Sequence, residues 1–148
     1  MENYPKIYLY RRIVQAKLFI DEHYSEEIDL ANISDEAHFS KFHFIRLFKN
    51  IYGFTPHQYL TYVRIEKAKI FLADNMSVAD TCSSVGFSSI SSFTGLFRKH
   101  TGQSPSEFQR LALARKRDIA LAPLNFIPNC FAESNGWKKN SNFQEVNM

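Results

Sequence analysis

The chain has few of the residues that cross-link small proteins covalently or through metal. Its 148 residues include two cysteines, Cys82 and Cys130, which form neither a C-x-x-C pair nor a zinc-binding spacing. So low a count excludes a disulfide-rich scaffold and is typical of a reducing compartment. We therefore expect a cytoplasmic protein that holds no metal and no other cofactor.

Long apolar runs and catalytic motifs are missing as well. No stretch approaches the roughly 20 apolar residues that a membrane span needs, and the start, "MENYPKIYLY", lacks the pattern of a secretory signal. Four of the five histidines, His38, His43, His57 and His100, could suggest metal or acid–base chemistry, but no H-E-x-x-H motif or glycine-rich phosphate loop accompanies them. We expect no membrane partner, no catalytic residue and no enzyme.

Positive charge gathers in one region of the chain. Residues 41–117 contain twelve Lys and Arg but only four Asp and Glu, a net charge of +8, although the whole chain carries only +3. The remaining residues are therefore acidic on balance, at −5. A concentrated basic region is typical of a polyanion partner such as nucleic acid.

One sixteen-residue pattern occurs twice. "FIRLFKNIYGFTPHQY" spans 44–59 and "FTGLFRKHTGQSPSEF" spans 93–108. The identical pairs are Phe44/Phe93, Leu47/Leu96, Phe48/Phe97, Gly53/Gly102 and Pro56/Pro105. Two copies are too few for a solenoid, so the repeat indicates one structural unit used twice.

Each copy has the order of a helix-turn-helix. A short helix (29–38 or about 77–85) precedes a tight turn and a second helix (41–52 or 90–100). A glycine then ends that helix, and a G-x-[ST]-P element restarts one, with Thr55 or Ser104 as N-cap. We predict an all-α fold of about seven helices, with two helix-turn-helix subdomains joined by a long central helix.

Four segments follow from this pattern. We expect a first helix-turn-helix unit at 6–56, which includes an amphipathic helix from Lys6 to His23, and a central helix at 56–74. A second helix-turn-helix unit with the last helix follows at 75–120. The C-terminal extension at 121–148 is rich in Asn and Pro but also apolar, which leaves disorder and packing against the second repeat both open.

Apolar spacing divides each second helix into two faces. Phe44, Leu47, Phe48 and Ile51 recur at i, i+3, i+4 and i+7, which predicts a buried face. Phe93, Leu96 and Phe97 predict the same for the second copy. The opposite faces carry basic and bulky side chains, available to a partner.

The repeated residues resemble the DNA-binding domain of AraC/XylS-type transcriptional regulators over about 11–110. The resemblance lies in "FSKFHFIRLFKNIYGFTPHQYLTYVRIEKAKIFL" and "VADTCSSVGFSSISSFTGLFRKHTGQSPSEFQR". It implies a monomeric DNA-binding unit on double-stranded promoter DNA and activation of transcription through RNA polymerase. The chain looks like the small stand-alone branch of that family or a fragment of a longer regulator.

The second helix of each copy, at 41–52 and at 90–100, would then enter one of two successive major grooves. The central helix, roughly 28 Å long at about 1.5 Å per residue, is close to one DNA turn of about 34 Å. Arg46 is the best candidate base reader because arginine can bond guanine twice. Candidate base contacts are Phe42, Ile45, Arg46, Ile90, Ser91 and Thr94. Candidate backbone contacts are Ser40, Lys41, Lys49, Arg64, Ser89, Arg98 and Lys99.

The sequence leaves the role of Arg64, the reading by the second unit and the function itself with alternatives. Arg64 has two interpretations, a phosphate anchor or a brace of the central helix. Family members often carry arginine at the position of Gly95 and a polar residue at that of Ile90, so we predict unequal half-sites. The alternative function is a protein-interaction module that kept the fold and lost specific DNA reading. RNA binding is less expected, because no exposed aromatic platform is evident.

Overall fold

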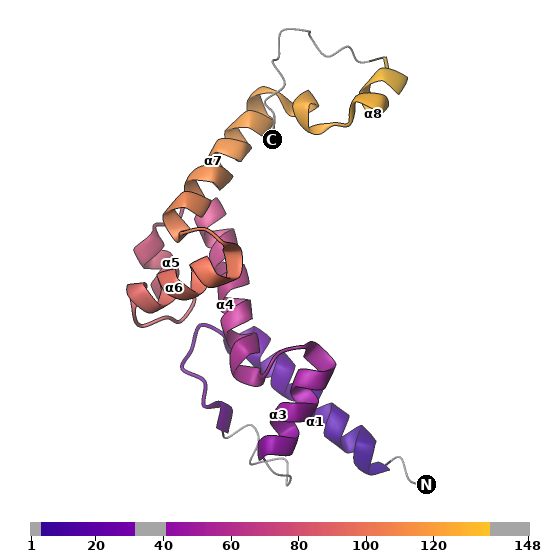
Figure 1. Cartoon of the computed structure of the whole chain (residues 1–148), viewed down its shortest axis with the longest axis vertical. Coiled ribbons are helices and arrows are strands. Elements are labelled where there is room, and N and C mark those ends of the chain that lie inside the picture. The colour runs from indigo at the N-terminus through magenta and orange to yellow at the C-terminus, as the bar shows by residue number, and fades with distance from the viewer. Residues whose placement is uncertain (1–3, 32–40, 137–148) are drawn as a thin grey trace. The chain divides into compact units, whose positions relative to one another are not determined.

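The computed structural model describes residues 4–31 and 41–136, and within them it is all-helical (Figure 1). Seven α-helices and one 3₁₀-helix occur in these ranges, and they contain no strand. The helices are α1 (Tyr4–His23), α3 (Lys41–Tyr52), α4 (Pro56–Ala73), α5 (Val78–Ser84), α6 (Ile90–Thr101), α7 (Pro105–Leu121), η1 (Pro123–Phe126) and α8 (Asn129–Ser134). The all-α prediction is confirmed, whereas most of the helix expected at 29–38 lies outside the described residues.

The chain divides into two compact units, Met1–Gln109 and Arg110–Met148, so the boundary falls inside α7. The first compact unit contains both copies of the repeat. The second begins with the exposed last turns of α7 and continues through η1 and α8.

α1, α3 and the first half of α4 share one core. Its buried members are Ile13, Ala16, Ile20, Phe44, Phe48, Leu60 and Val63. The two α3 phenylalanines are one turn apart, so one face of the helix faces this core, as the apolar spacing predicts. Burying each such ring stabilises the fold by about 1.5–3 kcal/mol.

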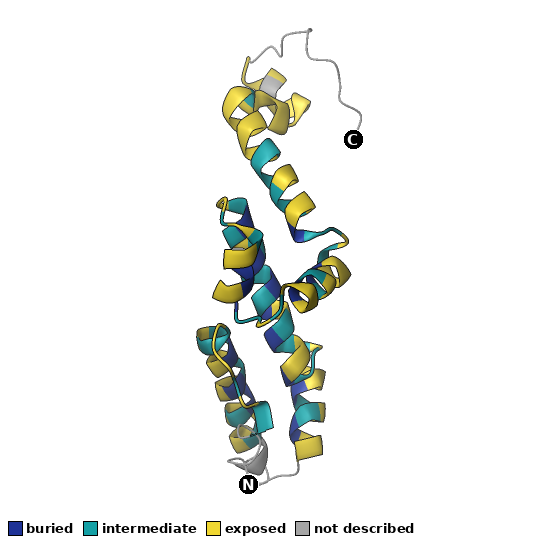
Figure 2. Cartoon of the chain, turned by 90° about the vertical axis from the view of Figure 1, so that its left-hand side faces the viewer, coloured by how far each residue is buried: buried dark blue, intermediate teal, exposed yellow. Residues whose placement is uncertain are grey.

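The second half of α4 packs with α5 and α6 around a separate core. Its buried members are Ile65, Ala68, Leu72, Cys82, Val85, Phe93 and Phe97. Figure 2 shows buried positions along α4, which contributes to both cores. Val63 belongs to the first cluster and Ile65 to the second, so the change of core occurs at Arg64.

Capping fixes where the helices restart. The Thr55 hydroxyl accepts from the backbone N–H of Gln58 at 3.3 Å, and the Gln58 side chain accepts from the backbone N–H of Thr55 at 3.0 Å. This confirms the predicted capping box. In the second copy the Ser104 hydroxyl accepts from the backbone N–H of Glu107 at 3.2 Å. The C-cap Gly102 has φ 79°, in the left-handed region that favours glycine.

Two predictions about α3 need correction. Ile51 is 42% exposed, not buried, because the last turn of α3 faces the first core with Tyr52 instead, whose ring centre lies 4.9 Å from that of Phe48. Ile45, expected on the outer face, is half-buried and packs against the first core. The inward face of α3 is therefore turned slightly from the one that spacing alone indicates.

The described part of the second compact unit is largely exposed. Within it, η1 and α8 are short helices that follow Leu121. Large apolar side chains remain accessible on this part of the chain, namely Leu111, Ile119, Leu121, Leu124, Phe126 and Phe131. Residues 137–148, the end of the predicted extension, lie outside the described range.

Candidate nucleic-acid interface

The solvent-facing side of α3 is basic with one large apolar group. Lys41, Arg46 and Lys49 are exposed, and Phe42 is 77% exposed. These side chains project from a helix whose opposite side is held by Phe44 and Phe48 in the core. Because that packing fixes the rotation of α3, it presents the same four side chains outward.

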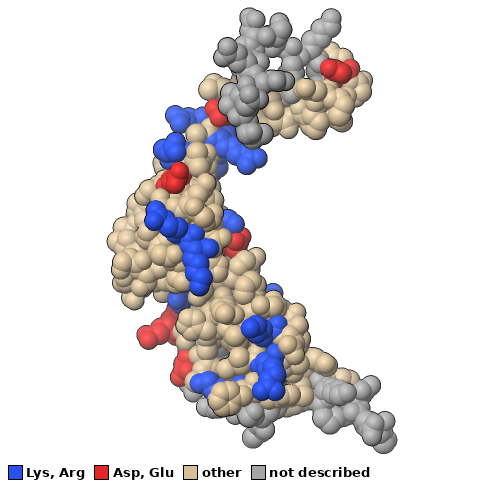
Figure 3. All heavy atoms as spheres, in the orientation of Figure 1, with Lys and Arg blue, Asp and Glu red and all other residues tan. Residues whose placement is uncertain are grey.

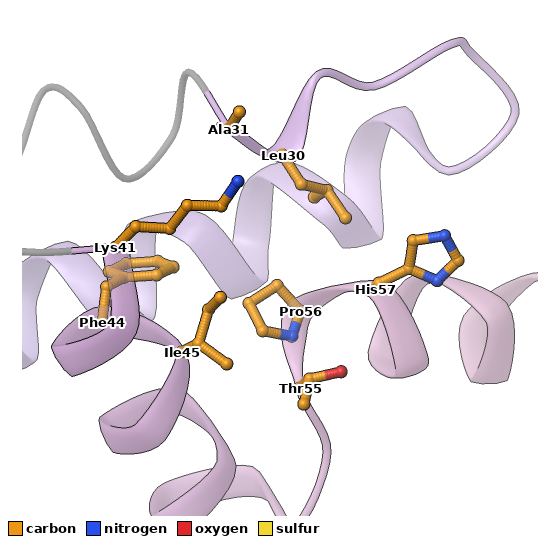
Figure 4. A pocket seen from close by; sticks show the side chains of 8 residues that line it. All are labelled: Leu30, Ala31, Lys41, Phe44, Ile45, Thr55, Pro56 and His57. Atoms are coloured by element: carbon orange, nitrogen blue, oxygen red, sulfur yellow. The ribbon is translucent and has the colours of Figure 1, made fainter.

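Ile45 lies at the flank of that face, next to a pocket of 330 Å³ between α3 and the start of α4. Figure 4 shows the Ile45 and Phe44 side chains near Pro56, with Leu30 and Lys41 also lining the pocket. The Ile45 side chain is thus engaged with its own fold. Its expected role in reading bases stays a prediction, with less free surface than the sequence suggests.

The outer side of α6 carries smaller or apolar side chains in its first turns than the outer side of α3 does. Ile90 is 53% exposed, Ser91 is exposed and Thr94 is half-buried. Gly95 adds no side chain, and a Cβ placed there would meet nothing within 4 Å. Arg98 and Lys99, by contrast, are exposed in the last turns of the helix.

The N-terminus of α6 is capped by Ser89. Its hydroxyl accepts from the backbone N–H of Ser92 at 3.4 Å and lies 2.8 Å from the hydroxyl of Ser91. The start of a helix, where backbone N–H groups point outward, is a favourable place for a phosphate. The corresponding cap of α3, Ser40, lies outside the described residues.

Exposed Lys and Arg side chains occur on α3, α6 and α7. Figure 3 shows Lys and Arg side chains at the surface of each of the two compact units. The α7 group contains Arg110, Arg115, Lys116 and Arg117, which are all exposed.

Arg64 points elsewhere. Its Nε donates to the carbonyl of Tyr24 at 2.7 Å and its Nη2 donates to the carbonyl of Glu26 at 2.9 Å. Burial lowers the pKa of this guanidinium from its ordinary value. Of the two interpretations of Arg64, these contacts favour the brace.

Sequence reasoning missed a second long-range link in the same compact unit. The Tyr59 hydroxyl donates to Asp21 Oδ1 at 2.7 Å, and Lys17 Nζ lies 2.6 Å from Asp21 Oδ2. Burial, followed by the bond to Asp21, raises the pKa of Tyr59 to about 12. Tyr59 and Asp21 are 38 residues apart, so no local spacing could indicate the pair.

This repeated, core-anchored arrangement matches a known domain. A family model described as a helix-turn-helix domain matches residues 33–111, more than half of the chain. The chain belongs to the AraC-type family of helix-turn-helix transcriptional regulators. The predicted resemblance is confirmed, and both α3 and α6 lie inside the matched residues.

Relatives in the AraC-type family differ in length. AdaA of Bacillus subtilis, a bifunctional transcriptional activator and DNA repair enzyme, is 35% identical over 95 residues, which is 64% of this chain and 45% of AdaA. PqrA of Proteus vulgaris, a probable transcription factor, is 35% identical over 86 residues, which is 57% of this chain and 70% of PqrA. The chain thus spans less than half of AdaA.

A solved structure of the DNA-binding domain of AdpA, a global transcriptional factor, in complex with a target DNA, has a similar fold. It superposes with a TM-score of 0.66 at 27% identity, over 71% of this chain and 96% of that domain. In the described ranges we find no helix long and apolar enough to cross a bilayer, and no group of three metal-ligating side chains.

Proposed function

We propose that the chain is a sequence-specific double-stranded DNA-binding regulator that inserts α3 and α6 into successive major grooves. The observation that carries this proposal is the pair of equivalent helices, each held by two buried phenylalanines and each turning a polar face outward. A helix of about 10–12 Å diameter fits a major groove of about 12 Å.

The two helices would contribute unequally. On α3, Arg46 reads a guanine, Phe42 contacts thymine methyl groups, and Ile45 adds a small apolar contact. On α6, Ile90, Ser91 and Thr94 make shorter contacts, and Gly95 makes none. The half-site under α3 therefore carries most of the sequence preference.

Phosphate contacts would set the position of the domain on the duplex. Lys41 and Lys49 contact phosphates beside α3. Arg98, Lys99 and the N-terminus of α6, which Ser89 caps, contact phosphates beside α6. Ser40, as the cap of α3, fills the matching role there. Such contacts supply affinity without sequence information, and we assign Arg64 to the brace rather than to this group.

The regulatory role is proposed from the family. The relatives AdaA and PqrA are named as a transcriptional activator and a probable transcription factor. We propose that this chain also activates transcription, through contact with RNA polymerase at a promoter in the cytoplasm, and that one copy suffices to occupy both grooves. The domain boundaries 6–56, 56–74, 75–120 and 121–148 remain part of this proposal.

In-vitro selection of bound DNA tests the proposal. Selected sequences should converge on one asymmetric site, and binding should weaken steeply with salt because several phosphates are neutralised. Failure to enrich any sequence, with a protein partner captured instead, would favour the interaction module.

A further inference from the structure

We infer that Arg64 is a positioning residue that fixes the spacing between the two recognition helices. It does so at the centre of a contact that we call the central brace, formed by Arg64, Tyr24, Glu26, Gly86 and Phe87. This inference rests on the proposed function, since a fixed spacing matters only if α3 and α6 read one duplex together.

The brace begins at the end of α1. Arg64 projects from the middle of α4 and donates to two carbonyls of the segment after α1, those of Tyr24 and Glu26, at 2.7 and 2.9 Å. Two bonds from one planar guanidinium hold both position and orientation. They tie α4 to the segment that leaves the first core.

The same guanidinium reaches the second helix-turn-helix. Its Cζ lies 5.5 Å from the centre of the Phe87 ring, a distance at which a cation and a ring attract. Phe87 packs against the second core, and its ring centre is 5.4 Å from that of Phe93 in α6. One side chain thus contacts the segment after α1 and, through one ring, the second recognition helix.

Gly86 brings the two halves into direct backbone contact. A Cβ at this position would lie 2.9 Å from the carbonyl oxygens of Tyr24 and Ser25 and 3.0 Å from Arg64 Nη2. Gly86 also has φ 92°, a backbone conformation that residues with a side chain rarely adopt. The turn between α5 and α6 therefore rests on the segment after α1 with no room for a side chain.

The central brace lies beside the middle of α4, the helix that joins the two helix-turn-helix halves. The core changes between Val63 and Ile65, on either side of Arg64. Tyr24 is partly buried and packs against both clusters. A single α-helix can bend or twist along its length, whereas a tie off its axis restricts both motions. The position of the brace is therefore suited to holding α3 and α6 at one separation and one relative rotation.

Binding to DNA with altered spacing tests the inference on the full chain. The probes are the selected site and the same site with one base pair inserted between its halves, which shifts one groove by about 3.4 Å and about 34°. Arg64→Met keeps the apolar stem and removes the donors. Lys69→Met is the matched control, because Lys69 is also on α4 but pairs with Glu66 at the surface, at 2.8 Å.

We expect the insertion to weaken wild-type and Lys69→Met binding at least about thirtyfold, which is the order of losing a specific contact set. In Arg64→Met the penalty should fall to about threefold or less, while affinity for the unaltered site also drops. A general loss of folding would lower binding to both probes alike and leave their ratio unchanged. Arg64→Lys and Gly86→Ala repeat the test if Arg64→Met does not fold, with the same reduced ratio expected.

The outcomes separate the two proposals. A folded Arg64 or Gly86 variant with the wild-type penalty overturns the brace. A wild-type protein that is indifferent to the insertion overturns the proposed insertion into two grooves, and the brace with it.

Discussion

Phe48 and Phe97 occupy equivalent places in the two copies of the repeat, and both are fully buried. Each also has an edge-on ring neighbour from the helix that follows. Phe48 meets Tyr59 at 5.8 Å and 63°, and Phe97 meets Phe108 at 5.4 Å and 75°. The repetition in the sequence is thus a repetition of packing, with T-shaped rings that join α3 to α4 and α6 to α7.

The hydroxyl that distinguishes Tyr59 from Phe108 makes stability depend on pH. In the folded protein the pKa of Tyr59 is raised to about 12, whereas an unfolded tyrosine titrates near a pKa of about 10. Its stabilising contribution is therefore complete below about pH 10 and is lost as pH rises toward about 12. The raised pKa of Lys17, caused chiefly by its bond to Asp21, acts in the same direction.

Tyr59→Phe should lower the free energy of unfolding by about 1 kcal/mol near pH 8, because the bond to Asp21 is lost. At pH 11 the difference from wild type should shrink or reverse. Urea unfolding at both pH values measures it, with Tyr62→Phe, an exposed tyrosine of the same helix, as control. A difference that does not change between pH 8 and pH 11 would contradict the assigned role.

Two glycines of the second helix-turn-helix should respond oppositely to alanine. Neither Gly95 nor Gly102 has an atom within 4 Å of the place that a Cβ would occupy, so an alanine side chain would not clash at either position. Gly95 lies inside α6, where alanine should stabilise by about 0.5–1 kcal/mol. Gly102 has φ 79°, where alanine should destabilise by about 1–2 kcal/mol. Urea unfolding of both variants checks this, and equal signs would refute it.

Arg46 and Lys99 should lose different properties when changed to alanine. Arg46→Ala should cost about 1–3 kcal/mol on the preferred sequence and flatten base preference in one half-site. Lys99→Ala should weaken all sequences alike and reduce the salt slope by about one. Titrations on the selected site and on scrambled half-sites separate the two. Equal losses on every sequence would overturn the base-reading role of Arg46.

The repeat made most of this fold predictable from sequence. For the predicted helices that the structure describes, bounds came within a few residues because G-x-[ST]-P elements, N-caps and apolar spacing all mark the same positions. The error at Ile51 could have been avoided from the second copy. Its equivalent there is His100, a residue that indicates an exposed position at the end of the helix.

The contacts that sequence could not predict are those between segments far apart in the chain. The sequence leaves Arg64 with two interpretations, a phosphate anchor or a brace, and only the fold brings the carbonyls of Tyr24 and Glu26 to it. The bond from Tyr59 to Asp21 is of the same kind. Local patterns report which face of a helix is buried, but not what that face or a polar side chain will meet.

Protection of guanine N7 from methylation on the selected DNA site tests the central claim most directly, because N7 lies in the major groove. Two protected clusters about 10 base pairs apart on one face of the duplex are expected, with stronger protection under α3. A single protected cluster, or two clusters on opposite faces, would contradict it.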